Sequence, residues 1–181
     1  MSARRGGCRG RDTAALVLRA TLGPMLFAHG WNKAAGPGGL DGTTGWFRSL
    51  GLEPAHLHAR MAAGTEMAAG VGLALGAGGP LPAAAAVGLM TVAARTDHRG
   101  KGFFVFKGGW EYVGVVGGAA VALAALGPGR YSVDGLLRRD RGGPGPALLA
   151  AGLGVVSAAV LLKLSYHPDD KPAEPAEPAE Q

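Results

Sequence analysis

The feature that most constrains this chain is the separation of its charged residues from long apolar stretches. The clearest stretch runs from Leu148 to Leu162, where Ser157 is the single polar side chain. A helix that packs in a water-soluble bundle carries polar residues on one face, recurring every three or four positions. This stretch has no such face, so it predicts a helix surrounded by lipid. A soluble all-helical bundle is the structural alternative, and it would require polar faces on the other segments.

Five apolar segments predict helices that cross a membrane. At 1.5 Å rise per residue the first segment covers about 28 Å, close to the ~30 Å thickness of a bilayer's hydrocarbon layer. It also fits a secretory signal peptide, but its charged Arg19 and the apolar segments that follow favour a membrane helix. We therefore predict an all-α fold, a transmembrane four-helix bundle with a fifth C-terminal transmembrane helix. The predicted spans are residues 13–31, 58–78, 83–96, 111–126 and 146–164.

The polar segments beside the spans divide the chain into regions. Two long polar connections, 32–57 and 97–110, join spans of the core. The Pro-Ala-Glu repeats at the C-terminus cannot bury a core, which predicts disorder. The expected order is a basic disordered arm (1–12), a four-helix membrane core (13–137), an Arg/Gly-rich linker (138–145), the fifth transmembrane helix (146–166) and a disordered tail (167–181). The four arginines of the arm place the N-terminus in the cytoplasm by the positive-inside rule, although basic residues also lie on the predicted outer side.

Charge and cysteine content exclude several classes of function. The net charge is +5, but the arginines cluster at the edges of apolar runs without a recognition motif, which fits lipid headgroups better than nucleic acid. The single cysteine, Cys8, excludes an intramolecular disulfide and a dithiol redox centre. His56 and His58 lie in a predicted loop and are too weak a signal for a metal site, so no metal is expected.

Two charged residues, Arg19 and Glu66, stand inside predicted spans. An unpaired charge there costs at least ~2.5–3.5 kcal/mol on insertion scales. We expect both side chains to face the interior of the bundle and to pair with each other or with other polar groups, and our hypothesis is that they pair with each other. Such an intramembrane polar pair would either fix the register of the helices or form part of a pocket for a ligand or a proton.

Polar and aromatic residues near the outer ends of the spans predict a ligand pocket. His29 and Lys33 are four residues apart and share one face if the helix continues that far. Snorkelling of Lys33 to the interface and helix capping by Glu111 are the structural alternatives. The combination suits an anion or a quinone headgroup equally well. The predicted pocket contains His29, Lys33, Lys101, Phe103, Phe104, Trp110, Glu111 and Tyr112.

The order of short motifs along the first four spans resembles a known family. The motifs are Leu18-Arg19-Ala20, Ala28-His29-Gly30 with Lys33, Leu50-Gly51-Leu52, Glu66, Lys101-Gly102-Phe103-Phe104, Gly109-Trp110-Glu111-Tyr112 and the run from Gly127 to Asp134. This order is similar to that of the DoxX family of bacterial integral membrane proteins, over roughly residues 13–137. The resemblance implies a four-helix core in the bacterial cytoplasmic membrane, crossed several times. The fifth span and the Pro-Ala-Glu tail depart from the family's simple pattern.

The resemblance also carries an expectation of function. It implies an integral membrane subunit of a redox-linked complex, related to quinone or thiol chemistry, and it leaves open whether the chain is an enzyme and which residues would be catalytic. Because the chain has no cofactor motif, it would need a redox-protein partner or a diffusible carrier such as a quinone. One alternative is a non-catalytic scaffold or assembly factor that packs through Gly70, Gly72 and Gly76. Another is a pathway for a small solute or protons through the charged residues within the spans.

Overall fold

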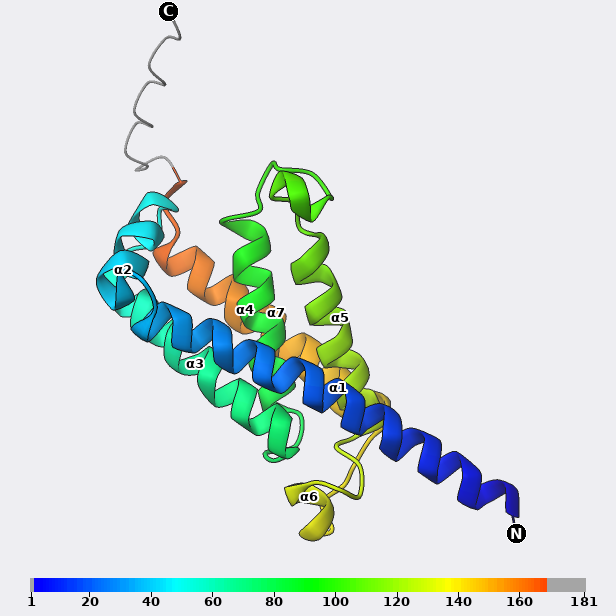
Figure 1. Ribbon diagram of the computed structural model, residues 1–181. Helices are drawn as coiled ribbons and strands as arrows, with labels where there is room; N and C mark the ends of the chain where they lie inside the picture. Colours follow the sequence, from blue (N-terminus) through cyan, green and yellow to red (C-terminus); the bar gives the residue numbers. More distant parts are fainter. Residues whose placement is uncertain (1, 169–181) are drawn as a thin grey trace, which may run out of the picture.

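The computed structural model describes residues 2–168, and this part of the chain is all-α, as predicted (Figure 1). Its longest helices run in alternating directions along the chain. The elements are α1 (Ser2–Ala35), α2 (Gly39–Ser49), α3 (Ala55–Leu75), α4 (Leu81–Arg95), the 3-10 turn η1 (Val105–Lys107), α5 (Glu111–Leu126), α6 (Val133–Leu136) and α7 (Pro144–Ser165).

The alternation gives the molecule two ends. The lower end in Figure 1 holds the start of α1, the turn between α3 and α4, and α6. The upper end holds α2, the connection between α4 and α5, and the end of α7. Helix α1 packs on α3, and α4 packs on both α5 and α7. Residues far apart in sequence are thereby brought together at each end.

Small side chains set the distances between these helices. The core contains Ala15, Ala86, Ala120 and Ala150, each 0% exposed. Between α1 and α3, a Cβ atom added to Gly30 would lie 2.6 Å from the backbone oxygen of Ala63. Gly30 therefore permits a backbone approach that any larger residue would prevent, which is how glycine is used between membrane helices.

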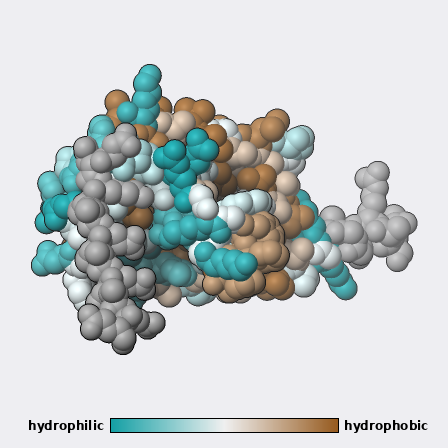
Figure 2. Space-filling view, turned by 90° about the horizontal axis from the view of Figure 1, so that it is seen from above, coloured by the Kyte–Doolittle hydropathy of each residue, from teal (hydrophilic) through white to brown (hydrophobic). Residues whose placement is uncertain are grey.

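Apolar side chains are exposed on the outside of the molecule. Within residues 2–168, α7 is the one helix long and apolar enough to cross a membrane on its own. Its Leu148 and Leu164 are 72% and 71% exposed. Helices α4 and α5 are apolar but shorter, and α1 and α3, which we also predicted as spans, do not reach the same apolar character. Figure 2, seen from the upper end, shows hydrophobic residues on one flank and hydrophilic residues on the other.

The N-terminal segment differs from its prediction. We expected a disordered arm over residues 1–12, but α1 begins at Ser2. Asp12 is 8% exposed and accepts a hydrogen bond from the Arg130 backbone N–H at 3.3 Å. Arg11 forms an ion pair with Asp140. These contacts, which the local sequence does not reveal, hold the end of the segment against the 127–141 region. Of the predicted tail, all but His167 and Pro168 lies outside the described residues.

The polar connection 32–57 contains a helix that we did not predict, α2. Phe47 of α2 is 8% exposed and packs in a second core cluster with Leu52, Ala55 and Ala59. The hydroxyl of Thr43 donates a hydrogen bond to the backbone oxygen of Lys33 at 2.9 Å. Helix α2 therefore folds back on α1 and α3 and forms part of the upper end.

Candidate functional site

A buried ion pair joins α1 to α3. The Lys33 Nζ atom lies 2.8 and 2.7 Å from the two carboxylate oxygens of Glu66. The Lys33 and Glu66 side chains are 15% and 8% exposed. The close contact of the two helices at Gly30 brings the pair within reach, because a Cβ there would also lie 2.9 Å from the Glu66 Cβ. Lys33 therefore neutralises the charge of Glu66. From the sequence, Lys33 was expected at the membrane interface or in the ligand pocket and not as the partner of Glu66.

A second polar contact joins α1 to α5. The Tyr112 hydroxyl lies 3.2 Å from Nε2 of His29 and 3.2 Å from Sδ of Met25. The His29 and Tyr112 rings have centroids 6.0 Å apart and are tilted by 45°. Since Tyr112 belongs to the first turn of α5, this contact positions the upper part of α5 against α1.

Both polar contacts border a cavity of about 570 Å³ among the helices. Ligand sites of drug-sized molecules typically measure ~300–1,000 Å³ and are mostly apolar with a few placed polar groups. The lining follows that description, since aliphatic residues of α4 and α7 face Lys33, Glu66, His29 and Tyr112. The other polar or aromatic lining residues are Trp46, Phe47, His58, Thr65, Thr96, Asp97, His98 and Ser157.

His58 is the lining residue with an unmet hydrogen-bonding need. It is 7% exposed, and its Nε2 atom is buried without a hydrogen-bond partner. A buried polar atom without a partner costs free energy, and such an atom in a native structure calls for an explanation. From the sequence alone, His58 stood out only beside His56, as a weak metal signal. The structure leaves His56 exposed, and the described residues contain no cluster of three metal-ligating side chains.

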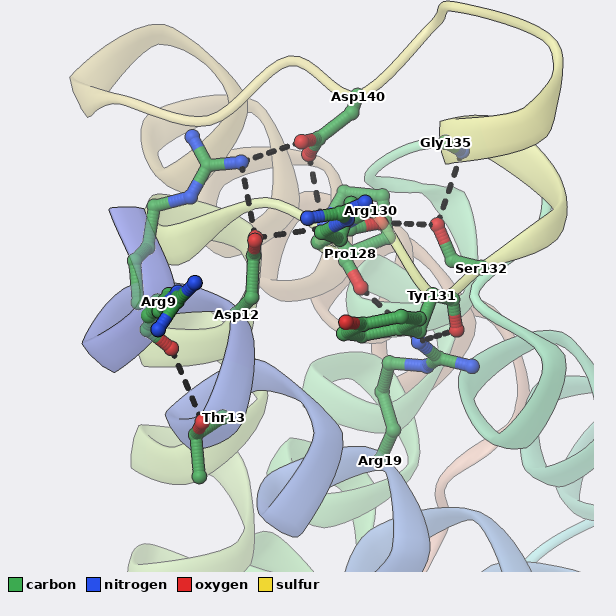
Figure 3. Close-up of polar contacts among 12 residues, drawn as sticks. Arg9, Asp12, Thr13, Arg19, Pro128, Arg130, Tyr131, Ser132, Gly135 and Asp140 are labelled. Carbon is green, nitrogen blue, oxygen red and sulfur yellow. Dashed lines mark hydrogen bonds and ion pairs between the residues drawn. The ribbon is translucent and has the colours of Figure 1, made fainter. Parts of the chain in front are cut away.

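Arg19 corrects the predicted polar pair. We expected it to pair with Glu66, and that prediction is wrong. Arg19 is 5% exposed, and its guanidinium donates to four backbone oxygens at the lower end. Figure 3 shows two of these contacts, those with Pro128 and Tyr131. The four oxygens belong to Leu73, Ala74, Pro128 and Tyr131, at 3.2, 2.8, 3.0 and 2.8 Å. The guanidinium therefore ties the end of α3 to the segment after α5.

Further polar contacts reinforce this lower end. Asp140 accepts a hydrogen bond from the Gly129 backbone N–H at 3.2 Å and pairs with Arg11. Ser132 accepts a hydrogen bond from the Gly135 N–H at 2.9 Å and so begins α6. Figure 3 shows Asp12, Asp140 and Arg130 gathered on the side of this segment away from Arg19. The whole group holds the loop in place and encloses no comparable cavity.

Five of the predicted pocket residues lie outside the cavity. The connection between α4 and α5 folds back on itself, with the Glu111 N–H donating to the Phe103 oxygen at 2.9 Å. The Phe103 ring packs edge to face on those of Phe104 and Trp110, and all three rings remain about half exposed. Glu111 accepts a hydrogen bond from the Val105 N–H at 3.1 Å, and Lys101 pairs with Asp97 at 3.3 Å. These residues stabilise the connection. The predicted residues that line the cavity are His29, Lys33, Tyr112 and, from the predicted pair, Glu66.

Comparison with known proteins finds a family match over a little less than half of the chain. The model of the DoxX family matches residues 14–99, which confirms the recognition of this family from the sequence. The match is shorter than the expected 13–137 and ends before α5. No curated protein and no solved structure matches the chain. DoxX is a family of membrane proteins, so the match implies contact with a lipid bilayer.

Proposed function

From the DoxX match over residues 14–99, we propose that the protein is a membrane subunit whose cavity holds the headgroup of a quinone and that it serves a redox-linked complex. The observation that carries this proposal is the cavity itself. It combines a mostly aliphatic lining with a buried Lys33–Glu66 pair and the His29–Tyr112 contact. A quinone has a planar ring with two carbonyl oxygens and an apolar chain, and this lining offers partners for each part.

The proposal includes a specific placement in the membrane. In it, α1, α3, α4 and α5 form the four-helix membrane core, and α7 is the fifth crossing. The exposed apolar residues of α7 and the alternating directions of the helices support this arrangement. We place the protein in a bacterial cytoplasmic membrane with the N-terminus inside. The upper end, which carries the polar side of the cavity, then faces outward.

The polar groups of the cavity fit a quinone ring chemically. The Lys33 ammonium has one N–H beyond the two that Glu66 accepts, and a quinone oxygen accepts hydrogen bonds. Tyr112 and His29 can exchange donor and acceptor roles through the hydroxyl and the imidazole tautomer. His58 has a buried nitrogen without a protein partner. When bound, a quinone would supply two-electron redox chemistry, which the side chains of this chain lack.

Thermal unfolding with added quinone tests this function. A ligand that binds only the folded protein stabilises it by about 2.7 kcal/mol at one hundred times its Kd. We expect a raised melting temperature of the purified protein in detergent with decylubiquinone, and no change with decylbenzene, which has the chain without the carbonyls. His29→Phe and Tyr112→Phe should reduce the shift. Phe106→Leu, an exposed residue outside the cavity, is the matched control. An equal shift with decylbenzene, or no shift with ubiquinone and menaquinone analogues, would refute the proposal.

The two alternative functions lose the specific features on which they were based. Gly70, Gly72 and Gly76, proposed to contact partner helices, contact other parts of this chain instead. A Cβ on each would lie 2.6 Å from the Phe27 nitrogen, the Pro82 Cγ and the Ser132 Cβ, respectively. For the pathway of a small solute or protons, Arg19 and Glu66 were to act together, but among the described residues they belong to separate groups of contacts. The quinone proposal is therefore the one that the geometry supports best.

A further inference from the structure

The position of α7 determines how the cavity is closed. Helix α7 packs along α4 and α5. It has no comparable contact with α3. Close contact with α4 occurs at Gly154, where a Cβ would lie 2.6 Å from the Ala84 backbone oxygen. Helix α4 thus stands between α3 and α7 and forms the back wall of the cavity. On the side of the cavity away from α4, no described helix lies between α3 and α7.

The upper end of this side is closed by the backbone. The Glu53 N–H donates to the Ser165 oxygen at 2.9 Å, and the His167 N–H donates to the Gly51 oxygen at 2.7 Å. Between them, Leu52 and Tyr166 form an isolated antiparallel bridge. This latch ties the end of α7 to the chain just before α3, so the gap between the two helices does not continue to the top of the molecule.

Below the latch, the cavity reaches the outer surface through mostly apolar residues. Met61 of α3, Leu153 of α7 and Leu81 of α4 line the cavity and are also 47%, 44% and 58% exposed. By contrast, Glu66 and Ala158 line the cavity but are 6% and 2% exposed. Residues that belong to both the cavity and the outer surface mark its mouth. Thr65 of α3 and Ser157 of α7 also line the cavity and are exposed, as are His29 and Trp46 towards its upper end. The rim between α3 and α7 is thus aliphatic and thioether apart from two hydroxyls, and the Ser157 hydroxyl donates a hydrogen bond to the Gly154 backbone oxygen at 2.9 Å. Such a rim is more favourable against lipid than against water.

The lining is also graded along its length. At the upper end of α4, the lining residues are Thr96, Asp97 and His98, while at the lower end they are Leu81 and Ala84. Thr96 to His98 lie just beyond the last residue of α4, and at 1.5 Å per residue this 15-residue helix is about 22 Å long. The graded lining matches a molecule with a polar head and one apolar chain.

We propose that the cavity opens sideways to the bilayer between α3 and α7, and that it takes a single-chain amphiphile directly from the membrane. The head lies at Lys33, Glu66 and His58, and the chain lies towards Leu81 and Leu153. This inference rests on the membrane placement of the proposed function, but it does not require that the amphiphile be a quinone.

Site-specific fluorescence tests the direction of the mouth. In a Cys8→Ser background, Met61→Cys and Leu153→Cys are each labelled with a small fluorophore in detergent and reconstituted in vesicles. Val160→Cys, exposed on α7 outside the cavity, is the lipid control, and Arg99→Cys, exposed in a polar connection, is the water control. We expect brominated-acyl lipids to quench the mouth positions as they quench Val160→Cys. Iodide quenching of the mouth positions comparable with that at Arg99→Cys would overturn the proposal.

A nitroxide-labelled stearate tests whether an amphiphile uses this mouth. Trp46 lines the cavity and reports occupancy once Trp31→Phe and Trp110→Phe remove the other tryptophans. Leu153→Arg places a charge in the mouth and should reduce quenching of Trp46 severalfold. Val160→Arg, the same change on the same helix away from the cavity, should leave it unchanged. Equal quenching in both variants would refute sideways access. Quenching by the stearate without any quinone-dependent stabilisation would refute the proposed function alone.

Discussion

The Lys33–Glu66 pair allows a quantitative test of how this fold tolerates charge in its interior. Glu66→Gln preserves the shape of the side chain but removes the carboxylate that holds the Lys33 ammonium at 2.8 and 2.7 Å. Because the Lys33 side chain is only 15% exposed, water cannot replace the lost partner well. Breaking a buried pair by removing one charge costs about 3–5 kcal/mol. For a chain of this size, that loss lowers the melting temperature on the order of 10 °C.

A double-mutant cycle separates the pair from other effects of the substitution. The variants are Glu66→Gln, Lys33→Met and the two combined, with stability measured by thermal or denaturant unfolding in one detergent. The double variant leaves no charge at this buried pair. We therefore expect its loss in free energy of unfolding to be smaller than the sum of the two single losses, by roughly 1–3 kcal/mol. Glu53→Gln is the control, because Glu53 pairs with Arg48 at 3.6 Å with both side chains about half exposed. Such surface pairs contribute at most about 1 kcal/mol.

Two results would refute this reasoning. If Glu66→Gln and Glu53→Gln had the same effect, the burial of the Lys33–Glu66 pair would have no energetic consequence. If the losses of the single variants simply added in the double variant, the two side chains would not interact in the folded protein, whatever their distance.

Three further predictions concern packing and the lower end. Arg19→Lys keeps the charge but offers three N–H donors to four carbonyl oxygens. The free energy of unfolding in detergent should therefore fall by about 1–3 kcal/mol. An unchanged stability would contradict the role of Arg19 in joining α3 to the segment after α5. Gly30→Val should separate α1 from α3 and cost at least ~1–3 kcal/mol, whereas Gly64→Ala, which meets open space, should be neutral or raise stability by roughly 0.5–1 kcal/mol. Gly154→Val should likewise disrupt the packing of α7 on α4, and Gly152→Ala, which also meets open space, is its control. If the two variants of either pair had equal melting temperatures, the close contact at Gly30 or at Gly154 would be contradicted.

The helices were predictable because their ends are marked in the sequence. The predicted fourth span, 111–126, has the same bounds as α5, since a glycine-rich polar connection precedes it and Gly127-Pro128 follows it. Helix α2 was missed because its apolar content is small. Its burial comes from a few contacts, such as that of Phe47 with Leu52, between segments that the sequence does not place side by side.

The partners of the charged residues were not predictable from the same information. Burial requires that Arg19 and Glu66 find partners, but it does not say which. The four oxygens that accept from Arg19 are backbone atoms at a helix end and a loop, and they leave no signature in the side-chain sequence. Once they satisfied the guanidinium, Glu66 required another cation, and Lys33 was within reach.

The distribution of cavity residues along the chain has a consequence for specificity. The ion pair Lys33–Glu66 and the unpaired His58 lie within the segment that matches DoxX, whereas Leu153, Ser157 and Leu161 belong to α7, outside that segment. Most polar groups that would hold a headgroup thus lie in the matching segment, while the apolar wall is shared between α4, inside that segment, and α7, outside it. Substitutions on α7 can therefore alter the width of the mouth and the length of chain accepted without disturbing the ion pair. A change in headgroup preference, by contrast, requires changes among the polar lining residues of α1, α3 and α5, and of these Glu66 also packs against Gly30, where α1 and α3 approach closely.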